Sequence, residues 1–378
     1  MEPGEIIGPN VTRLRIDREL SQAALAERAG ISRVSLGKIE RGETVPRART
    51  LSALARALRA STADLVTPVE PLERVRFRAR RRVNSREQIL AETSTWLSAY
   101  AWLEKELGQE RRFKLQEIVG AAVAPDVLAA RAREGLGLGP RESVRDICGL
   151  LEDNGVKMLM IEKASDLFFG LSVGPADGGP AIVVNTWERI SVERWIFTAV
   201  HELGHILMHL AAFDRRQTDE DAAEERQADR FASHFLMPDG VFEDEWQECA
   251  GLSLVERVFK LKRIFRVSYK TVLYRLKESG RMGADAFAVF QGQYKRYAGH
   301  TLKKIDEPQA LAEGEFRFNW NRAGELGDQL SKYDFIEDRL SRLVREALEK
   351  EVISLGRAAE ILALPLNEMR ELAGTWVQ

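Results

Sequence analysis

The sequence is poor in the residues that build covalent or metal-stapled frameworks. Its 378 residues include 2 cysteines, Cys148 and Cys249, and neither has the spacing of a zinc or redox motif. A disulfide framework is therefore excluded as the basis of the fold. We expect two free buried thiols in a reducing compartment. Low-complexity tracts and tandem repeats are also absent.

Long apolar runs and a net charge are missing as well. No apolar run approaches the roughly 18 residues that a membrane span needs, and the N-terminus lacks a basic region followed by an apolar core. The formal net charge is −2, so any affinity for nucleic acid must come from a local patch. We expect a cytoplasmic protein with no membrane partner. A length of 378 residues predicts two or three domains.

Histidine is scarce, yet three of the 5 histidines lie in V-H-E-L-G-H-I-L-M-H, from Val200 to His209. In a helix, His201 and His205 lie one turn apart on one face, so both imidazoles can reach one ion at roughly 2.0–2.1 Å. In this H-E-x-x-H pattern, Glu202 takes a proton from the attacking water and passes it to the leaving amine. The spacing therefore predicts a catalytic Zn2+ site for peptide hydrolysis.

A catalytic zinc needs a third protein ligand, and an acidic segment follows the histidines. From Glu224 to Pro238 the chain reads E-E-R-Q-A-D-R-F-A-S-H-F-L-M-P, with apolar residues at helical spacing. This spacing puts Glu225 and Asp229 one turn apart. We predict Glu225 as the third ligand and Asp229 as the acceptor of a ligand histidine's free ring N–H. Glu224 is the alternative ligand, since a motif register can slip by one.

The remaining histidines are weaker candidates. His209 lies about 12 Å of helix beyond His201, so it cannot share an ion with both other histidines. We predict that His209 contacts a metal-binding residue without binding the metal itself, or that it caps the end of the helix. His234 is predicted to be structural, with a role in the site as the alternative. His300 stands alone in a polar segment and carries no signal.

Several motifs around this site resemble the ImmA/IrrE metallopeptidases over roughly residues 125–282. They comprise Arg194, Phe197 and Thr198, H-E-L-G-H, E-x-x-A-D-x-F-A from Glu225 to Ala232, L-M-P, and upstream G-L-G-L-G-P, F-F-G-L-S and P-A-I-V-V-N. The resemblance implies a zincin-like domain that cuts a transcriptional repressor, or relieves its repression, during DNA damage or mobile-element stress.

A second resemblance lies near the N-terminus. Asn10 to Leu65 reads as five short helices; Ser21 and Ser32 are N-caps for helices at 22–29 and 33–40, and Gly30 supplies the turn between them. This helix-turn-helix order, with L-S-Q-A-A-L-A-E-R-A-G-I-S-R-V-S-L-G-K-I-E-R-G, is similar to the lambda-repressor-like (XRE) family. The resemblance implies double-stranded DNA as a partner and a homodimer. The residues implied to face bases or phosphates are Gln22, Arg33, Ser35 and Lys38.

Seven arginines fall between Arg74 and Arg86. They indicate either a phosphate-binding arm or a solvated linker helix whose arginines pair with acids elsewhere. The stretch V-R-F-R-A-R at 75–80 also looks like the joint of proteins in which an XRE domain is fused to an ImmA/IrrE domain. A helix is predicted at 87–107, with an apolar stripe that packs on the peptidase domain.

The remaining patterns complete the predicted architecture. Strands are predicted at 156–161, 168–173 and 181–185, and a basic helix pair at 255–282, for which DNA binding, substrate binding and core packing stay open. The fold class is α+β and mostly helical. We predict a helix-turn-helix domain at 1–68, an arginine-rich joint at 69–124, a zinc peptidase domain at 125–282 and helices of unknown role at 283–378.

These parts together predict a DNA-binding transcriptional regulator fused to a zinc-dependent endopeptidase. Its protein partner would be a repressor or a toxin-like neighbour. The alternative is a repressor or antitoxin in which the peptidase fold is a catalytically silent module for partner binding or sensing.

Overall fold

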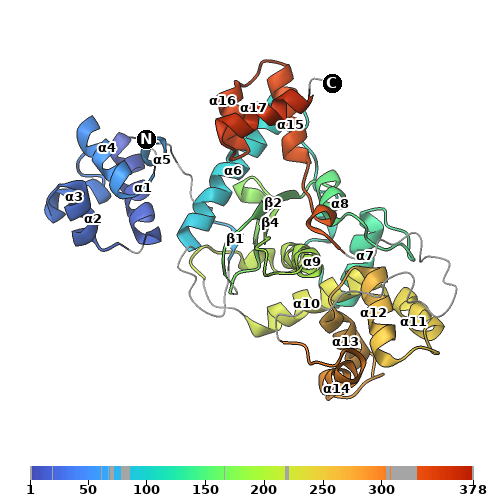
Figure 1. The fold of residues 1–378 in the computed structure, drawn as a ribbon. Helices are drawn as coiled ribbons and strands as arrows, with labels where there is room; N and C mark the ends of the chain where they lie inside the picture. Colours follow the sequence, from blue (N-terminus) through green and yellow to red (C-terminus); the bar gives the residue numbers. More distant parts are fainter. Residues whose placement is uncertain are drawn as a thin grey trace. The chain divides into compact units, whose positions relative to one another are not determined.

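The computed structural model describes residues 2–18, 20–60, 62–66, 68, 72–77, 86–165, 167–217, 221–303, 307 and 330–376. The described chain is mostly helical with one small sheet of mixed direction, which confirms the predicted fold class (Figure 1). It forms two compact units, one of Met1–Leu72 with Arg82–Ala99 and the other of Glu73–Arg81 with Tyr100–Gln378. The predicted division into four regions stays a prediction.

The first unit opens with five short helices. They are α1 (Pro3–Asp17), α2 (Gln22–Ala29), α3 (Arg33–Glu40), α4 (Ala48–Ala57) and α5 (Thr62–Val66). The hydroxyls of Ser21 and Ser32 accept hydrogen bonds from Ala24 N and Ser35 N, so α2 and α3 begin where predicted. Gly30 ends α2 at a φ of +66°, a conformation that favours glycine. The fully buried residues of this core include Val11, Leu25, Leu36, Leu54 and Leu58.

Helix α6 (Arg86–Leu107) follows, and its residues divide between the two units. Four of the five residues of its predicted apolar stripe, Ile89, Trp96, Tyr100 and Leu103, are below one-tenth exposure, and the fifth, Leu107, is half-buried. Within the described ranges, no helix is both long and apolar enough to cross a membrane.

The second unit holds the sheet. Its strands are β1 (Val75–Arg76), β2 (Lys157–Ile161), β3 (Gly170–Val173) and β4 (Ala181–Asn185), in the order β1-β3-β4-β2. Strand β4 is parallel to β2 and antiparallel to β3, and β1 is antiparallel to β3. Three of these strands were predicted and β1 was not. The apolar residues beside Arg76 explain why strand β1 forms. Val75 and Phe77 are buried on either side of Arg76, and Phe77 stacks on Phe168 with ring centroids 4.9 Å apart.

Helices α9 (Val192–Met208) and α10 (Ala222–Leu236) carry the residues of the predicted site, and α7 (Pro125–Gly135) and α8 (Ile147–Asp153) precede them in the same unit. Helix α9 packs on β3 and β4 and lies beside α10, which in turn packs on α7 (Figure 1). A Cβ atom on Gly204 would lie 2.9 Å from Cδ1 of the buried Phe231. Glycine at this position therefore allows α9 and α10 to approach closely.

The rest of the second unit is helical. Its elements are α11 (Asp239–Glu248), α12 (Leu254–Phe265), α13 (Tyr269–Glu278), α14 (Ala286–Ala298), α15 (Arg339–Glu349), α16 (Leu355–Ile361) and α17 (Leu366–Trp376), with 3-10 helices at Gln116–Ile118, Pro175–Asp177, Leu210–Ala212 and Lys332–Asp334. The basic residues of α12 and α13 include buried ones: Lys262 pairs with Glu193 and Glu307, and Arg275 with Asp239 and Glu278. These charges favour the core-packing interpretation of the helix pair. Cys148 and Cys249 are buried and free, as predicted.

Candidate functional site

Helix α9 presents two histidines on one face. Ser191 caps its N-terminus by accepting a hydrogen bond from Arg194 N, and the buried residues of α9 fix it against the sheet. The rings of His201 and His205 lie 4.6 Å apart between centroids, and their Nε2 atoms are 3.0 Å apart. Both Nε2 atoms therefore point at one place.

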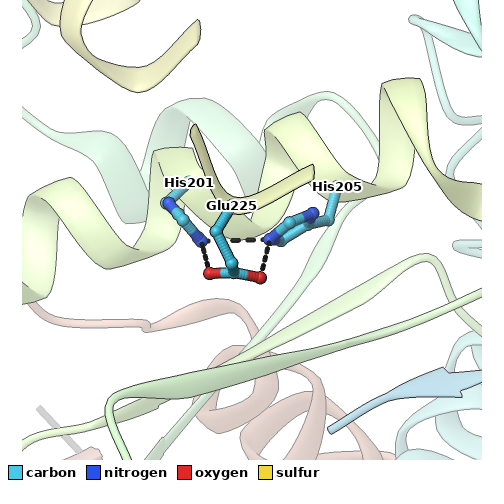
Figure 2. A group of neighbouring side chains, drawn as sticks. All are labelled: His201, His205 and Glu225. Carbon is cyan, nitrogen blue, oxygen red and sulfur yellow. Dashed lines mark hydrogen bonds and ion pairs between the residues drawn. The ribbon is translucent and has the colours of Figure 1, made fainter. Parts of the chain in front are cut away.

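Helix α10 brings Glu225 to the same place. Its Oε2 lies 3.3 Å from His201 Nε2, and its Oε1 lies 3.3 Å from His205 Nε2 (Figure 2). Among the described residues, these three form a group whose ligand atoms all lie within 4.8 Å of one another. Glu224, the alternative ligand, is not in this group, and its carboxylate accepts a hydrogen bond from Arg76.

The group fits a zinc ion in both geometry and chemistry. Ligand atoms at roughly 2.0–2.1 Å in a tetrahedron lie about 3.3 Å apart. The two Nε2 atoms are 3.0 Å apart, and each lies 3.3 Å from one of the two oxygens of Glu225. Two imidazole nitrogens with one carboxylate oxygen form a donor set typical of catalytic zinc, which leaves the fourth position open.

Hydrogen bonds on the far sides of the rings fix the tautomers. His201 Nδ1 lies 2.9 Å from Asp229 Oδ1. An ionised carboxylate can accept a hydrogen bond but cannot donate one, so Nδ1 carries the proton. His205 Nδ1 lies 2.8 Å from His209 Nδ1, and His209 Nε2 lies 2.8 Å from Gln227 Oε1. When the rings are neutral, the network assigns the ring proton to Nδ1 in both histidines, so both Nε2 lone pairs are available to a metal once His201 has lost its second proton. Asp229 and His209 thus contact the histidines that they were predicted to support, whereas Gln227 was not predicted.

The proposed base, Glu202, is buried beside the ligands. Its Oε2 accepts a hydrogen bond of 2.7 Å from the hydroxyl of Ser172 on β3. Burial raises the pKa of Glu202, and the opposing effects of His201 and of the Ser172 hydrogen bond do not cancel it. A carboxylate with a raised pKa is the better proton acceptor. Ser172, like Gln227, was missed, because a serine in a short apolar strand carries no signal of its own.

A residue of β1 reaches the ligand carboxylate. Arg76 is 3% exposed; its guanidinium donates from NH1 to Glu224 Oε2 at 2.5 Å and from NH2 to Glu225 Oε1 at 2.7 Å. Arg76 is buried in strand β1, so it lies in neither a phosphate-binding arm nor a solvated helix, although it does pair with acidic residues elsewhere in the chain, as the second interpretation predicted. Its ion pairs within the fold agree with a joint. Arg78, Arg80, Arg81 and Arg82 lie outside the described residues.

The electrostatics of the ligands differ from residue to residue. Burial disfavours a charged His201, but its hydrogen bonds to Asp229 and Glu225 outweigh burial and raise its pKa to about 9. Burial dominates at His205 and lowers its pKa well below the ordinary value. Burial alone would raise the pKa of Glu225, but the two histidines lower it strongly. The metal-free group therefore favours an ionised carboxylate beside one protonated and one neutral imidazole.

The two other histidines take no part in this group. His234 is 8% exposed; its Nδ1 lies 3.0 Å from Asp239 Oδ1, and its Nε2 lies 3.1 Å from Glu278 Oε2 and 2.8 Å from Arg275 NH1. This network joins α10, α11 and α13, which agrees with the predicted structural role. His300 Nδ1 lies 3.1 Å from the carbonyl oxygen of Ala298.

Comparisons with known families match two parts of the chain. A helix-turn-helix family matches residues 11–65, and the IrrE N-terminal-like domain matches residues 161–277. The chain joins a helix-turn-helix regulator domain to an IrrE-like peptidase domain. A relative, an uncharacterized HTH-type transcriptional regulator of Sinorhizobium fredii, is 39% identical over 70 residues, which are 18% of this chain and 91% of the relative. The peptidase match contains His201, His205 and Glu225, whereas Arg76 lies outside both matched ranges.

The helix-turn-helix domain exposes one face of α3. Arg33, Ser35 and Lys38 are exposed on it, and Val34 is 70% exposed. Leu36 on the opposite face is fully buried. The second helix of such a motif enters the major groove, so this exposed face is the one that DNA can contact.

Two of the four predicted DNA contacts already have partners within the protein. The Gln22 amide donates to Glu40 Oε2 at 2.7 Å, and Ser35 Oγ lies 2.8 Å from Ser32 Oγ at the start of α3. Both side chains therefore also fix the ends of α2 and α3. Arg33 and Lys38 remain the exposed cations of this face.

Proposed function

We propose that this protein is a DNA-binding regulator whose peptidase domain cuts a protein partner with one zinc ion, held by His201, His205 and Glu225. The convergence of these three side chains is the observation that carries the proposal. Two further features support it: the ring tautomers leave both Nε2 atoms available, and a buried carboxylate lies beside the ligands.

Each residue around the site has a defined task in peptide hydrolysis. Bound zinc supplies a Lewis acid that polarises the scissile carbonyl and lowers the pKa of water to about 7. Glu202 accepts the proton of the attacking water and delivers it to the leaving amine. Ser172 holds Glu202 Oε2 and so orients the carboxylate. Asp229 and the His209–Gln227 pair keep the ligand rings in place.

The DNA-reading part of the proposal rests on α3. Arg33 and Lys38, with Gln22 and Ser35 beside them, contact base edges or phosphates. A single α3 covers few base pairs, so two chains act together as a homodimer on two half-sites. The peptidase domain then cuts a repressor or a toxin-like neighbour of the regulator in response to stress or to a mobile element.

One experiment separates this function from that of a silent binding module. The purified full-length protein is incubated with the protein encoded beside its gene, and the products are analysed by mass spectrometry. We expect wild type to cut the partner and Glu202→Gln to bind zinc and the partner without cutting. Cleavage by Glu202→Gln would remove this residue from the mechanism. Binding without cleavage by wild type would favour the silent module.

The ligand assignment has its own control. Elemental analysis should find one zinc per wild-type chain and much less zinc in His205→Ala, because two of three ligands cannot complete the site. Equal zinc in the two proteins would show that the metal is bound elsewhere.

A further inference from the structure

The guanidinium of Arg76 bridges two adjacent carboxylates of α10. One nitrogen donates to Glu224 and the other to Glu225, and the arginine side chain is 2% exposed. Charge-assisted hydrogen bonds from a guanidinium to carboxylates are short and directional, and burial strengthens them. The position of the Glu225 carboxylate is therefore fixed from the side of β1 as well as by its own helix.

The register of the sheet makes this contact specific. Arg76 lies directly opposite Ser172 in the antiparallel pair of β1 and β3, so the two side chains share one face of the sheet. Ser172 holds Glu202, and Arg76 holds Glu225. One cross-strand pair thus contacts both the proposed base and the proposed carboxylate ligand.

We propose that Arg76 is a positioning residue for the metal ligand Glu225. This inference rests on the proposed zinc site and adds to it a residue outside the matched peptidase range. Because Oε1 of Glu225 accepts a hydrogen bond from the guanidinium, coordination of a metal through both carboxylate oxygens would be disfavoured.

The dependence of the site on Arg76 has a structural consequence. Arg76 belongs to the segment that follows the helix-turn-helix domain, and β1 is attached to β3 through two residue pairs, Val75 with Val173 and Arg76 with Ser172. A displacement of this short strand would release Glu225.

The test compares two arginines of the same segment in the full-length protein. Arg76→Gln removes the contact with Glu225. Arg74→Gln removes an equal charge two residues earlier, where the side chain donates to the carbonyl oxygen of Phe213 at 3.4 Å. Zinc dissociation constants are measured by chelator competition, and visible absorption spectra are recorded with cobalt in place of zinc.

We expect Arg76→Gln to weaken zinc binding about 10–100-fold, the usual loss when a partner of a ligand is removed, and to change the cobalt spectrum. Arg74→Gln should match wild type in both. Arg76→Lys should recover part of the affinity, because lysine restores the charge without the two-pronged geometry. Zinc binding by Arg76→Gln that equals or exceeds that of wild type, with an unchanged cobalt spectrum, overturns the inference.

Further variants keep the test decisive if Arg76→Gln does not fold. Glu224→Gln keeps Glu225 but weakens the hydrogen bond that Glu224 accepts from Arg76. We expect a smaller loss of zinc affinity than in Arg76→Gln, together with a shifted cobalt spectrum. If Glu224→Gln and Arg76→Lys both fold and behave like wild type, Arg76 has no positioning role. A wild-type protein without zinc affinity would instead overturn the proposed metal site, so the two failures are distinguishable.

Discussion

Zinc should compete with a proton at this site. The pKa of His201 is raised to about 9 in the metal-free protein, because hydrogen bonds to Asp229 and Glu225 outweigh burial. A metal binds only the neutral imidazole, so the proton must leave before zinc can bind His201. Zinc affinity should therefore rise with pH until the pKa of His201 is passed.

The structure sets the size of this effect. Below the pKa of one displaced proton, each pH unit changes the apparent affinity tenfold, which is about 1.4 kcal/mol. Raising the pH from about 7 to about 9 should therefore tighten zinc binding by up to about 100-fold. Asp229→Asn removes the first of the two hydrogen bonds that raise the pKa of His201, so the affinity of this variant should change much less over the same range.

The assay compares how steeply zinc affinity changes with pH in wild type and in Asp229→Asn, and it does not compare affinities at a single pH. Asp229→Asn also weakens the support of the His201 ring, which by itself lowers affinity about 10–100-fold at every pH. Chelator competition at several pH values separates the two effects, and calorimetry in buffers of different ionisation enthalpy counts the protons released. A wild-type affinity that does not change between about pH 7 and 9, after correction for the chelator, would refute the reasoning. Equal slopes in wild type and variant would show that Asp229 does not control the proton.

Three further predictions test the helix contact, a buried carboxyl group and the DNA-reading helix. Gly204→Ala places a Cβ 2.9 Å from the buried Phe231 ring, so thermal melts should show a loss of about 1–3 kcal/mol in stability. Burial raises the pKa of Glu152 to about 8, so its contribution to stability is full below its ordinary pKa and is lost as the pH rises through about 8. Urea unfolding should show a smaller decline in Glu152→Gln than in wild type, with a difference of about 2–4 kcal/mol at high pH. Footprinting should show two protected half-sites about one helical turn apart, and Arg33→Ala should weaken binding by about 1–3 kcal/mol; protection of one half-site by a monomer would contradict the homodimer.

The elements that the sequence predicted well are those with local causes. Ser21, Gly30 and Ser32 determine the ends of α2 and α3 within a few residues of chain, so capping preferences were sufficient. The approach of His201 to His205 is likewise a property of one helical turn. Glu225 required a second helix, but the apolar spacing of α10 already placed it on the face with Asp229.

Residues whose roles depend on distant chain segments were missed or misread. Arg76 and Glu225 are 149 positions apart, and no local pattern connects them. An arginine in a run of arginines is typical of a solvated or nucleic-acid-binding segment, and only the pairing of β1 with β3 buries this one. Gln227 was missed for a similar reason, because a glutamine on an acidic helix is typical of a solvated face. Its role depends on His209 at the end of α9.

The charges around His201 and His205 explain why it is informative whether Arg76→Gln strengthens or weakens zinc binding. Four carboxyl groups, those of Glu202, Glu224, Glu225 and Asp229, lie around the two histidines, and Arg76 contributes a fixed positive charge. The excess negative charge favours a cation, which is the His201 proton in the metal-free protein and zinc when metal is present. By charge alone, Arg76→Gln would make the site more negative and strengthen zinc binding. Positioning of Glu225 has the opposite effect, since a carboxylate released from its guanidinium loses a defined orientation. Weaker zinc binding by Arg76→Gln would therefore mean that geometry outweighs charge at this site.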